Sequence, residues 1–114
     1  MKTYKIKDGS GKLLFSVKHS NVTLEIRDHK NKIQHYIINT GSYLEVKNTK
    51  GKSMKRVRVE NRGDFYLKQK GIVIEVFDSG NRKYYDIKHT GFFIEVLDPN
   101  RVSISRSEML KELV

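Results

Sequence analysis

Two stretches of the chain, fifty residues apart, share one alternating pattern: Val22-Thr23-Leu24-Glu25-Ile26-Arg27-Asp28 and Ile72-Val73-Ile74-Glu75-Val76-Phe77-Asp78. In the first stretch Val22, Leu24 and Ile26 point to one side, and the residues between them point to the other. This period of two is typical of a β-strand with one buried face. Both stretches are therefore predicted to be strands at equivalent places in the fold.

The match between the two halves of the chain continues without a gap. It pairs Asn31 with Asn81, Ile37 with Ile87, Thr40-Gly41 with Thr90-Gly91, and Leu44-Glu45-Val46 with Ile94-Glu95-Val96. The sequence predicts a tandem duplication, with one unit at about residues 4–53 and the other at about 54–106. With 114 residues and a hydrophobic fraction of 37%, the chain is long enough for one domain, residues 1–114.

Turn residues recur about every ten positions, as in Asp8-Gly9-Ser10-Gly11, Thr40-Gly41, Lys70-Gly71 and Asp98-Pro99-Asn100. They separate about eleven short strands, so the predicted fold class is all-β. We expect an antiparallel up-and-down meander that forms either a barrel or a sandwich. Longer loops opened by Asp or Asn alternate with tight turns. An odd number of strands in each unit would place the longer loops of the two units at opposite rims.

One short helix is predicted at the C-terminal end, at about residues 107–113. Ser107 can cap it, and Met109, Leu110, Leu113 and Val114 form an apolar stripe at helical spacing. So short a helix is not stable alone. We therefore expect it to dock on the sheet, on a barrel mouth or on another subunit.

The residue types present exclude several kinds of site. The chain has no Cys, which excludes disulfides, cysteine nucleophiles and thiolate metal sites. Its four histidines lack the spacing of a metal site, and no serine has a nearby His and acid in sequence. We therefore expect no catalytic residue, no metal and no cofactor. The N-terminus lacks the apolar run of a signal peptide and no segment is apolar enough to span a membrane, so we expect a cytoplasmic protein.

The charge gives the first indication of a partner. Lys and Arg number 23 and Asp and Glu number 13, for a formal net charge of +10. Such a balance favours a polyanion, either nucleic acid or an anionic lipid surface. Solubility alone is the alternative explanation.

The densest basic run lies at the junction of the two units, within residues 47–62. Its members, the candidate polyanion-binding residues, are Lys47, Lys50, Lys52, Lys55, Arg56, Arg58 and Arg62. Val57 and Val59 take the inward positions of this strand, so Arg56 and Arg58 are predicted to face outward and to contact phosphate oxygens without reading bases. The alternative is a solvated hairpin whose lysines discourage edge pairing.

The outward positions of the second unit are unusually apolar. Where the first unit has Thr23, Arg27, Gln34, Tyr43 and Lys47, the second has Val73, Phe77, Tyr84, Phe93 and Leu97. Apolar residues in outward positions must be covered by the terminal helix, by a second layer or by another chain. These five residues are therefore the candidate interface of a homodimer or a protein partner.

The segment from Tyr4 to Lys18, a strand, an Asp-x-x-Gly turn and a second strand, resembles the opening hairpins of tubby-like, LURP-one and scramblase-type proteins. The resemblance implies a twelve-stranded barrel around a C-terminal helix, and association with membranes or phosphoinositides. Two features depart from that pattern. This chain is shorter than the usual domain, and the predicted helix is short and amphipathic where a barrel-filling helix is long and apolar.

Two function classes follow from these patterns. The first is a non-enzymatic β module that binds a polyanion through the basic junction. The second is a protein-interaction or homo-oligomeric assembly module, such as a small phage or mobile-element protein, that works through the apolar sheet face.

Overall fold

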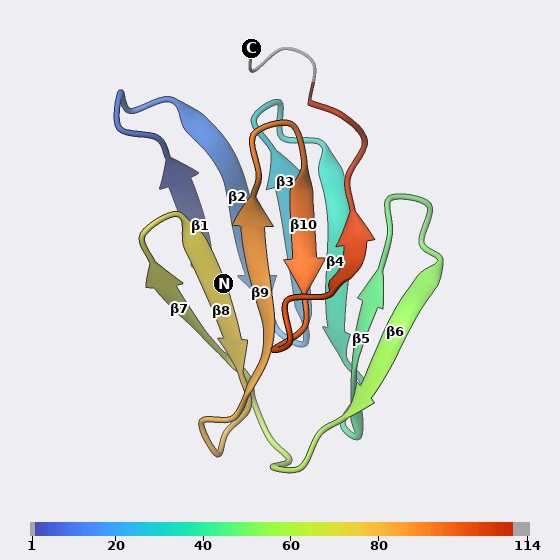
Figure 1. Ribbon diagram of the computed structural model, residues 1–114. Coiled ribbons are helices and arrows are strands. Elements are labelled where there is room, and N and C mark those ends of the chain that lie inside the picture. The colour runs from blue at the N-terminus through green and yellow to red at the C-terminus, as the bar shows by residue number, and fades with distance from the viewer. Residues whose placement is uncertain (1, 111–114) are drawn as a thin grey trace.

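The computed structural model describes residues 2–110, which form two antiparallel sheets and no helix (Figure 1). The first sheet contains, in spatial order, β1 (Lys2–Lys7), β2 (Leu13–Ser20), β3 (Thr23–Asp28), β4 (Ile33–Asn39), β5 (Tyr43–Lys47) and β6 (Ser53–Arg58). The second contains β7 (Tyr66–Lys70), β8 (Val73–Phe77), β9 (Lys83–His89), β10 (Ile94–Leu97) and β11 (Ser103–Arg106). The prediction of an all-β antiparallel fold with about eleven short strands is confirmed.

The two sheets face each other and do not close into a barrel, so the barrel alternative is wrong. Within each sheet a strand is hydrogen-bonded only to its neighbours in the chain, and this ladder breaks between β6 and β7. The break occurs because residues 59–65 leave the edge of the first sheet and cross to the second instead of forming a hairpin. On one side of the sandwich β11 lies near β5 and β6. On the other side the sheets end at β1 and β7.

Alternate residues of both sheets point into a single core between them. Phe15, Ile26 and Ile37 of the first sheet and Ile74 and Val96 of the second are all fully buried. Burial of each such side chain stabilises the fold by roughly 1.5–3 kcal/mol. The period of two in the sequence therefore determines which residues form the core.

Five loops share one hydrogen-bonding pattern, closed by an Asp or Asn side chain at the first position. Its oxygen accepts hydrogen bonds of 2.9 to 3.0 Å from the backbone N–H groups two and four residues later, in the loops that begin at Asp8, Asp28, Asn48, Asp78 and Asp98. Such side-chain bonds replace the backbone bonds that a loop lacks. Figure 1 shows the loops of the first sheet at one end of the sandwich and those of the second at the other.

Positions fifty residues apart also share backbone irregularities. The ladder between β3 and β4 shifts register after Ile26, and the ladder between β8 and β9 shifts after Val76. The φ angle is 55° at Asn21 and 62° at Gly71, in the left-handed region that both residue types tolerate. A duplication accounts for these matches, and the common origin of the two units stays a prediction.

Two buried polar side chains join the sheets across the core. In β4, Nε2 of His35 lies 2.7 Å from the carbonyl oxygen of Ile94, and Nδ1 lies 2.8 Å from the hydroxyl of Ser105. Because a carbonyl only accepts, Nε2 carries the proton and Ser105 donates to Nδ1. In β9, the hydroxyl of Tyr85 donates to the carbonyl of Leu44 at 2.9 Å. Burial lowers the pKa of His35 to about 4 and raises the pKa of Tyr85 well above its ordinary value, so both groups are neutral at pH 7.

The helix predicted at about residues 107–113 is not present in the part of it that the structure describes. Residues 107–110 run beside the start of β10, where the N–H of Ser107 donates to the carbonyl of Ile94 at 2.9 Å and the N–H of Leu110 donates to that of Phe92 at 2.7 Å. The Ser107 hydroxyl does not cap a helix but accepts from the N–H of Ile94 at 2.8 Å. This pairing satisfies backbone groups that so short a helix would leave open. Residues 111–114 lie outside the described residues.

Candidate polyanion-binding surface

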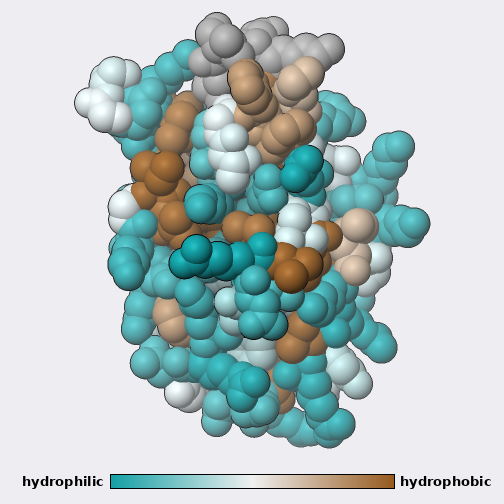
Figure 2. Space-filling view, in the orientation of Figure 1, coloured by the Kyte–Doolittle hydropathy of each residue, from teal (hydrophilic) through white to brown (hydrophobic). Residues whose placement is uncertain are grey.

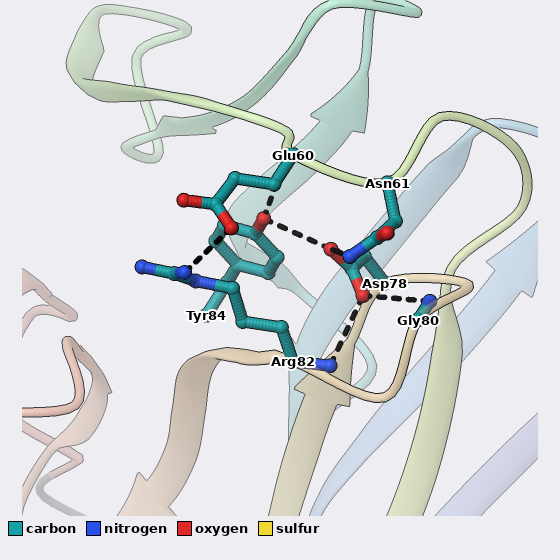
Figure 3. A network of polar contacts seen from close by, with 6 residues as sticks. All are labelled: Glu60, Asn61, Asp78, Gly80, Arg82 and Tyr84. Carbon is teal, nitrogen blue, oxygen red and sulfur yellow. Dashed lines mark hydrogen bonds and ion pairs between the residues drawn. The ribbon is translucent and has the colours of Figure 1, made fainter.

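Residues 59–65, the connection between the sheets, are held in place by a polar network (Figure 3). The N–H of Glu60 donates to the hydroxyl of Tyr84 at 3.0 Å, and that hydroxyl donates to Oδ2 of Asp78 at 2.9 Å. The side-chain amide of Asn61 donates to the same carboxylate oxygen at 3.0 Å. The network therefore attaches the connection to the loop between β8 and β9.

The Asp78 carboxylate is the centre of this network. Its Oδ1 accepts from the N–H groups of Gly80 and Arg82 at 2.9 and 3.0 Å. Burial acts to raise the pKa of Asp78, but the hydrogen bonds from Arg82, Asn61, Tyr84 and Gly80 outweigh it and hold the pKa below its ordinary value. The carboxylate thus stays charged at neutral pH and keeps all four donors.

Further hydrogen bonds fix the connection to both sheets. The hydroxyl of Ser79 donates to the carbonyl of Arg62 at 2.9 Å, and the side-chain amide of Asn39 donates to the carbonyl of Gly63 at 2.9 Å. Ser79 belongs to the second sheet's loops and Asn39 ends β4 of the first. The backbone that carries Arg62 is therefore tied down on both sides.

The only acid in the basic run is neutralised by a residue outside it. Arg82 lies 2.7 Å from the Glu60 carboxylate, an ion pair drawn in Figure 3. Arg58 and Arg62 line one hollow with Glu60, yet neither has a carboxylate of residues 2–110 within 4.0 Å. Both are exposed. Two guanidinium groups thus remain free to bind an anion.

An aromatic ring accompanies these arginines. The guanidinium of Arg56 lies 4.5 Å from the centre of the Tyr43 ring, a cation–π contact. Across the ladder of β5 and β6, Tyr43 faces Arg58 and Glu45 faces Arg56. We call Tyr43, Arg56, Arg58 and Arg62 the arginine surface.

The structure does not gather the seven predicted basic residues in one place. Lys47 pairs with Glu45 at 3.7 Å, and Lys55 pairs with Asp98 of the second sheet at 3.6 Å. Lys50 and Lys52 are exposed in the loop before β6, and Arg58 lies at the other end of that strand, about 20 Å from Lys52. Val57 and Val59 face the core as expected.

A second group of cations could not be recognised as a group in the sequence. Lys2, Lys5 and Lys7 of β1 and Lys68 and Lys70 of β7 are all exposed on the two edge strands at the opposite side of the sandwich. Residues 8–65 separate the two strands in the chain. Only the tertiary structure brings the two strands together. The one sign of this group in the sequence is that each strand has a lysine at every second or third position.

Four of the five predicted interface residues lie on the outer face of the second sheet. Val73, Phe77, Phe93 and Leu97 are half-buried there, and Figure 2 shows hydrophobic side chains gathered over the upper part of this face. Two of the rings are partly covered, by Lys68 at 4.5 Å from the centre of Phe77 and Arg106 at 4.8 Å from the centre of Phe93.

The fifth predicted interface residue, Tyr84, is placed wrongly by the sequence pattern. It is 4% exposed and belongs to the network of Figure 3. The register shift after Val76 sets Lys83 opposite Phe77, so Lys83 takes the outward position and Tyr84 turns inward. A bulge of this kind reverses the faces of the residues that follow it.

Among residues 2–110 no three His, Asp or Glu side chains converge as metal ligands, and no helix could cross a membrane. Comparisons with protein-family models, with curated proteins and with solved structures gave no match. The resemblance to tubby-like, LURP-one and scramblase-type proteins therefore stays a prediction, and the closed barrel that it implies is not formed.

Proposed function

We propose that the protein is a non-enzymatic β module that binds a polyanion, nucleic acid or an anionic membrane surface, through the arginine surface. The observation that carries this proposal is the ion pair of Arg82 with Glu60. It pairs the only acid of the basic run, residues 47–62, and leaves Arg58 and Arg62 without a carboxylate within 4.0 Å, on a backbone that both sheets hold in place. The cytoplasm stays its proposed location, on the sequence alone.

The chemistry of the surface suits phosphate groups. Arginine presents a planar set of donors that binds phosphate through two parallel hydrogen bonds, and its charge persists at any physiological pH. Arg56 and Arg58 are two residues apart on one face of β6, which separates them by about 6.6 Å. Tyr43 adds a ring on which a base or a sugar can stack. Contacts of this kind bind the backbone of a nucleic acid and do not select its sequence.

The proposal is tested by the salt dependence of binding to a labelled single-stranded oligonucleotide and to vesicles that contain phosphatidylserine. The double variant Arg58→Gln/Arg62→Gln is compared with wild type and with Lys12→Gln/Lys32→Gln, which loses the same charge from exposed loop positions at the other end of the sandwich. We expect the arginine variant alone to weaken binding and to reduce the slope of log Kd against log salt by about 1.4. Equal affinities and slopes for the two variants would contradict the proposal.

The apolar face of the second sheet supports a second candidate, a protein-interaction or homo-oligomeric assembly module. Val73, Phe77, Phe93 and Leu97 are half-buried on this face. Such a cluster is typical of an interface that another protein covers. A small phage or mobile-element protein would work in this way without catalysis. A molecular mass that stays monomeric at all concentrations in sedimentation would remove the homo-oligomeric form of this candidate.

A further inference from the structure

Charges of opposite sign are segregated across the sheets. The carboxylates that lie on strands, Glu25, Asp28, Glu45, Glu75, Asp86 and Glu95, all belong to interior strands. The four edge strands, β1, β6, β7 and β11, contain no Asp or Glu. The positive charge of this protein is therefore concentrated along its sheet edges.

The edges at β1 and β7 form one surface. Each is the last strand of its sheet, and Lys2 at the start of β1 and Tyr66 at the start of β7 line the same hollow, together with His19, Asp64 and Phe65. Figure 1 shows the two strands at the same side of the sandwich. We call the basic residues of these strands the lysine edge: Lys2, Lys5, Lys7, Lys68 and Lys70.

The charges of the lysine edge are not neutralised within the described chain. All five side chains are exposed, and no carboxylate of residues 2–110 lies within 4.0 Å of any of their ammonium groups. The strand behind β1, β2, contains no acid and adds Lys18, whereas the strand behind β7, β8, has Glu75 opposite Lys68 in the ladder. Protection against edge pairing accounts for a lysine on an edge strand but not for the lack of acids on β2, the strand behind β1. An anionic partner accounts for both.

Arg56 and Arg58 lie on the opposite side of the molecule from the lysine edge, and Arg62 lies on the connection that runs between the two sides. Strands β1 and β6 are the first and last of the six-stranded sheet. Five strand spacings separate them, which is about 24 Å. Surfaces on two sides of the molecule can each hold a different segment of a flexible polymer.

We propose that the protein binds two segments of nucleic acid at once, one on the arginine surface and one on the lysine edge, and thereby bridges them. The inference rests on the proposed function, because the first segment occupies the arginine surface. Each surface contacts the phosphate backbone alone, so the two segments need no sequence in common. When both segments belong to one long strand, the second contact forms at a high effective concentration.

The test is capture of a fluorescent oligonucleotide by a second, non-complementary oligonucleotide fixed to beads, in the presence of the protein. The variants are the lysine-edge triple Lys5→Gln/Lys68→Gln/Lys70→Gln, the arginine pair Arg58→Gln/Arg62→Gln, and the control Lys12→Gln/Lys32→Gln. We expect wild type and control to capture the fluorescent strand. The lysine-edge triple should still bind the beads but capture about tenfold less.

The outcomes separate this inference from the proposed function. Capture by the lysine-edge triple at the wild-type level would overturn the bridging proposal, and it would point to a dimer with one site on each subunit. Wild-type binding that depends on Arg58 and Arg62, without any capture, would overturn bridging and leave the proposed function standing. Clustering of phosphatidylserine vesicles without oligonucleotide binding would overturn the choice of nucleic acid.

Discussion

His35 and Tyr85 make the same hydrogen bond across the core, in opposite directions. His35 of the first sheet donates to the carbonyl of Ile94 in the second, and Tyr85 of the second donates to the carbonyl of Leu44 in the first. The two donors are fifty residues apart and so are the two acceptors, which is the spacing of the two predicted units. Each sheet thus has a buried polar side chain anchored in the other, which fixes how the sheets lie against each other.

The first prediction concerns the stability of the fold in acid. Burial lowers the pKa of His35 from 6.5 to about 4, although the bond to Ile94 opposes this shift. The unfolded chain therefore binds a proton at a higher pH than the folded chain does. We expect the free energy of unfolding to be unaffected by His35 above about pH 6.5 and to fall by about 3 kcal/mol between pH 6.5 and pH 4.

Urea unfolding at a series of pH values checks this expectation against His35→Gln, which cannot take up a proton. Between pH 6.5 and pH 4, the free energy of unfolding of the variant should fall less steeply with pH than that of wild type, because the His35 contribution is missing. Burial also lowers the pKa of His19 and His89, and both residues contribute equally to the two proteins. Identical slopes for wild type and variant would show that His35 is not buried in its neutral form.

The second prediction concerns the other cross-sheet bond. Tyr85→Phe removes the hydroxyl that donates to the Leu44 carbonyl and adds no new group. We expect a loss of about 1 kcal/mol in the free energy of unfolding, because only the net value of one buried hydrogen bond is removed. Tyr66→Phe is the control, since the Tyr66 side chain is 54% exposed. An equal effect of both changes in urea unfolding would be inconsistent with the structure.

The third prediction concerns the contact that positions the connection between the sheets. A Cβ atom at Gly80 would overlap the side-chain amide of Asn61, which donates to Asp78. Gly80→Ala should therefore lower the free energy of unfolding by roughly 1–3 kcal/mol. The matched control is Gly9→Ala, where nothing lies within 4 Å of the added Cβ. Thermal unfolding of both variants gives the comparison, and equal melting temperatures would count against the network of Figure 3.

The fourth prediction concerns the C-terminal segment. Ser107→Ala leaves the buried N–H of Ile94 without the hydroxyl that accepts from it. The expected cost is about 1–3 kcal/mol of folding free energy. Ser103→Ala, at an exposed position of β11, should be nearly neutral. Hydrogen exchange at the Ile94 amide is the most direct measurement, and unchanged protection in Ser107→Ala would refute the pairing.

The sequence alone determined the features that depend on neighbouring residues. The alternation in Val22 to Ile26 predicted which side chains are buried, because successive residues of a strand face opposite sides. The Asp and Asn residues at loop starts, such as Asp28 and Asp78, predicted the loops, since their side chains bond to backbone two residues on. The same local rule placed Val57 toward the core and left the basic residues beside it outside.

The tertiary structure decided what depends on contacts between distant residues. A register shift after Val76 turned Tyr84 inward, and no local pattern marks such a shift. Residues 107–110 run beside the start of β10 and do not form the predicted helix, because their backbone N–H groups donate to the carbonyls of Phe92 and Ile94. Whether the strands close into a barrel depended on the path of residues 59–65, and the lysine edge exists only because that path brings β7 beside β1. The spacing of residues along the chain predicts local conformation. The position of one sheet edge relative to another depends on the packing of the whole domain.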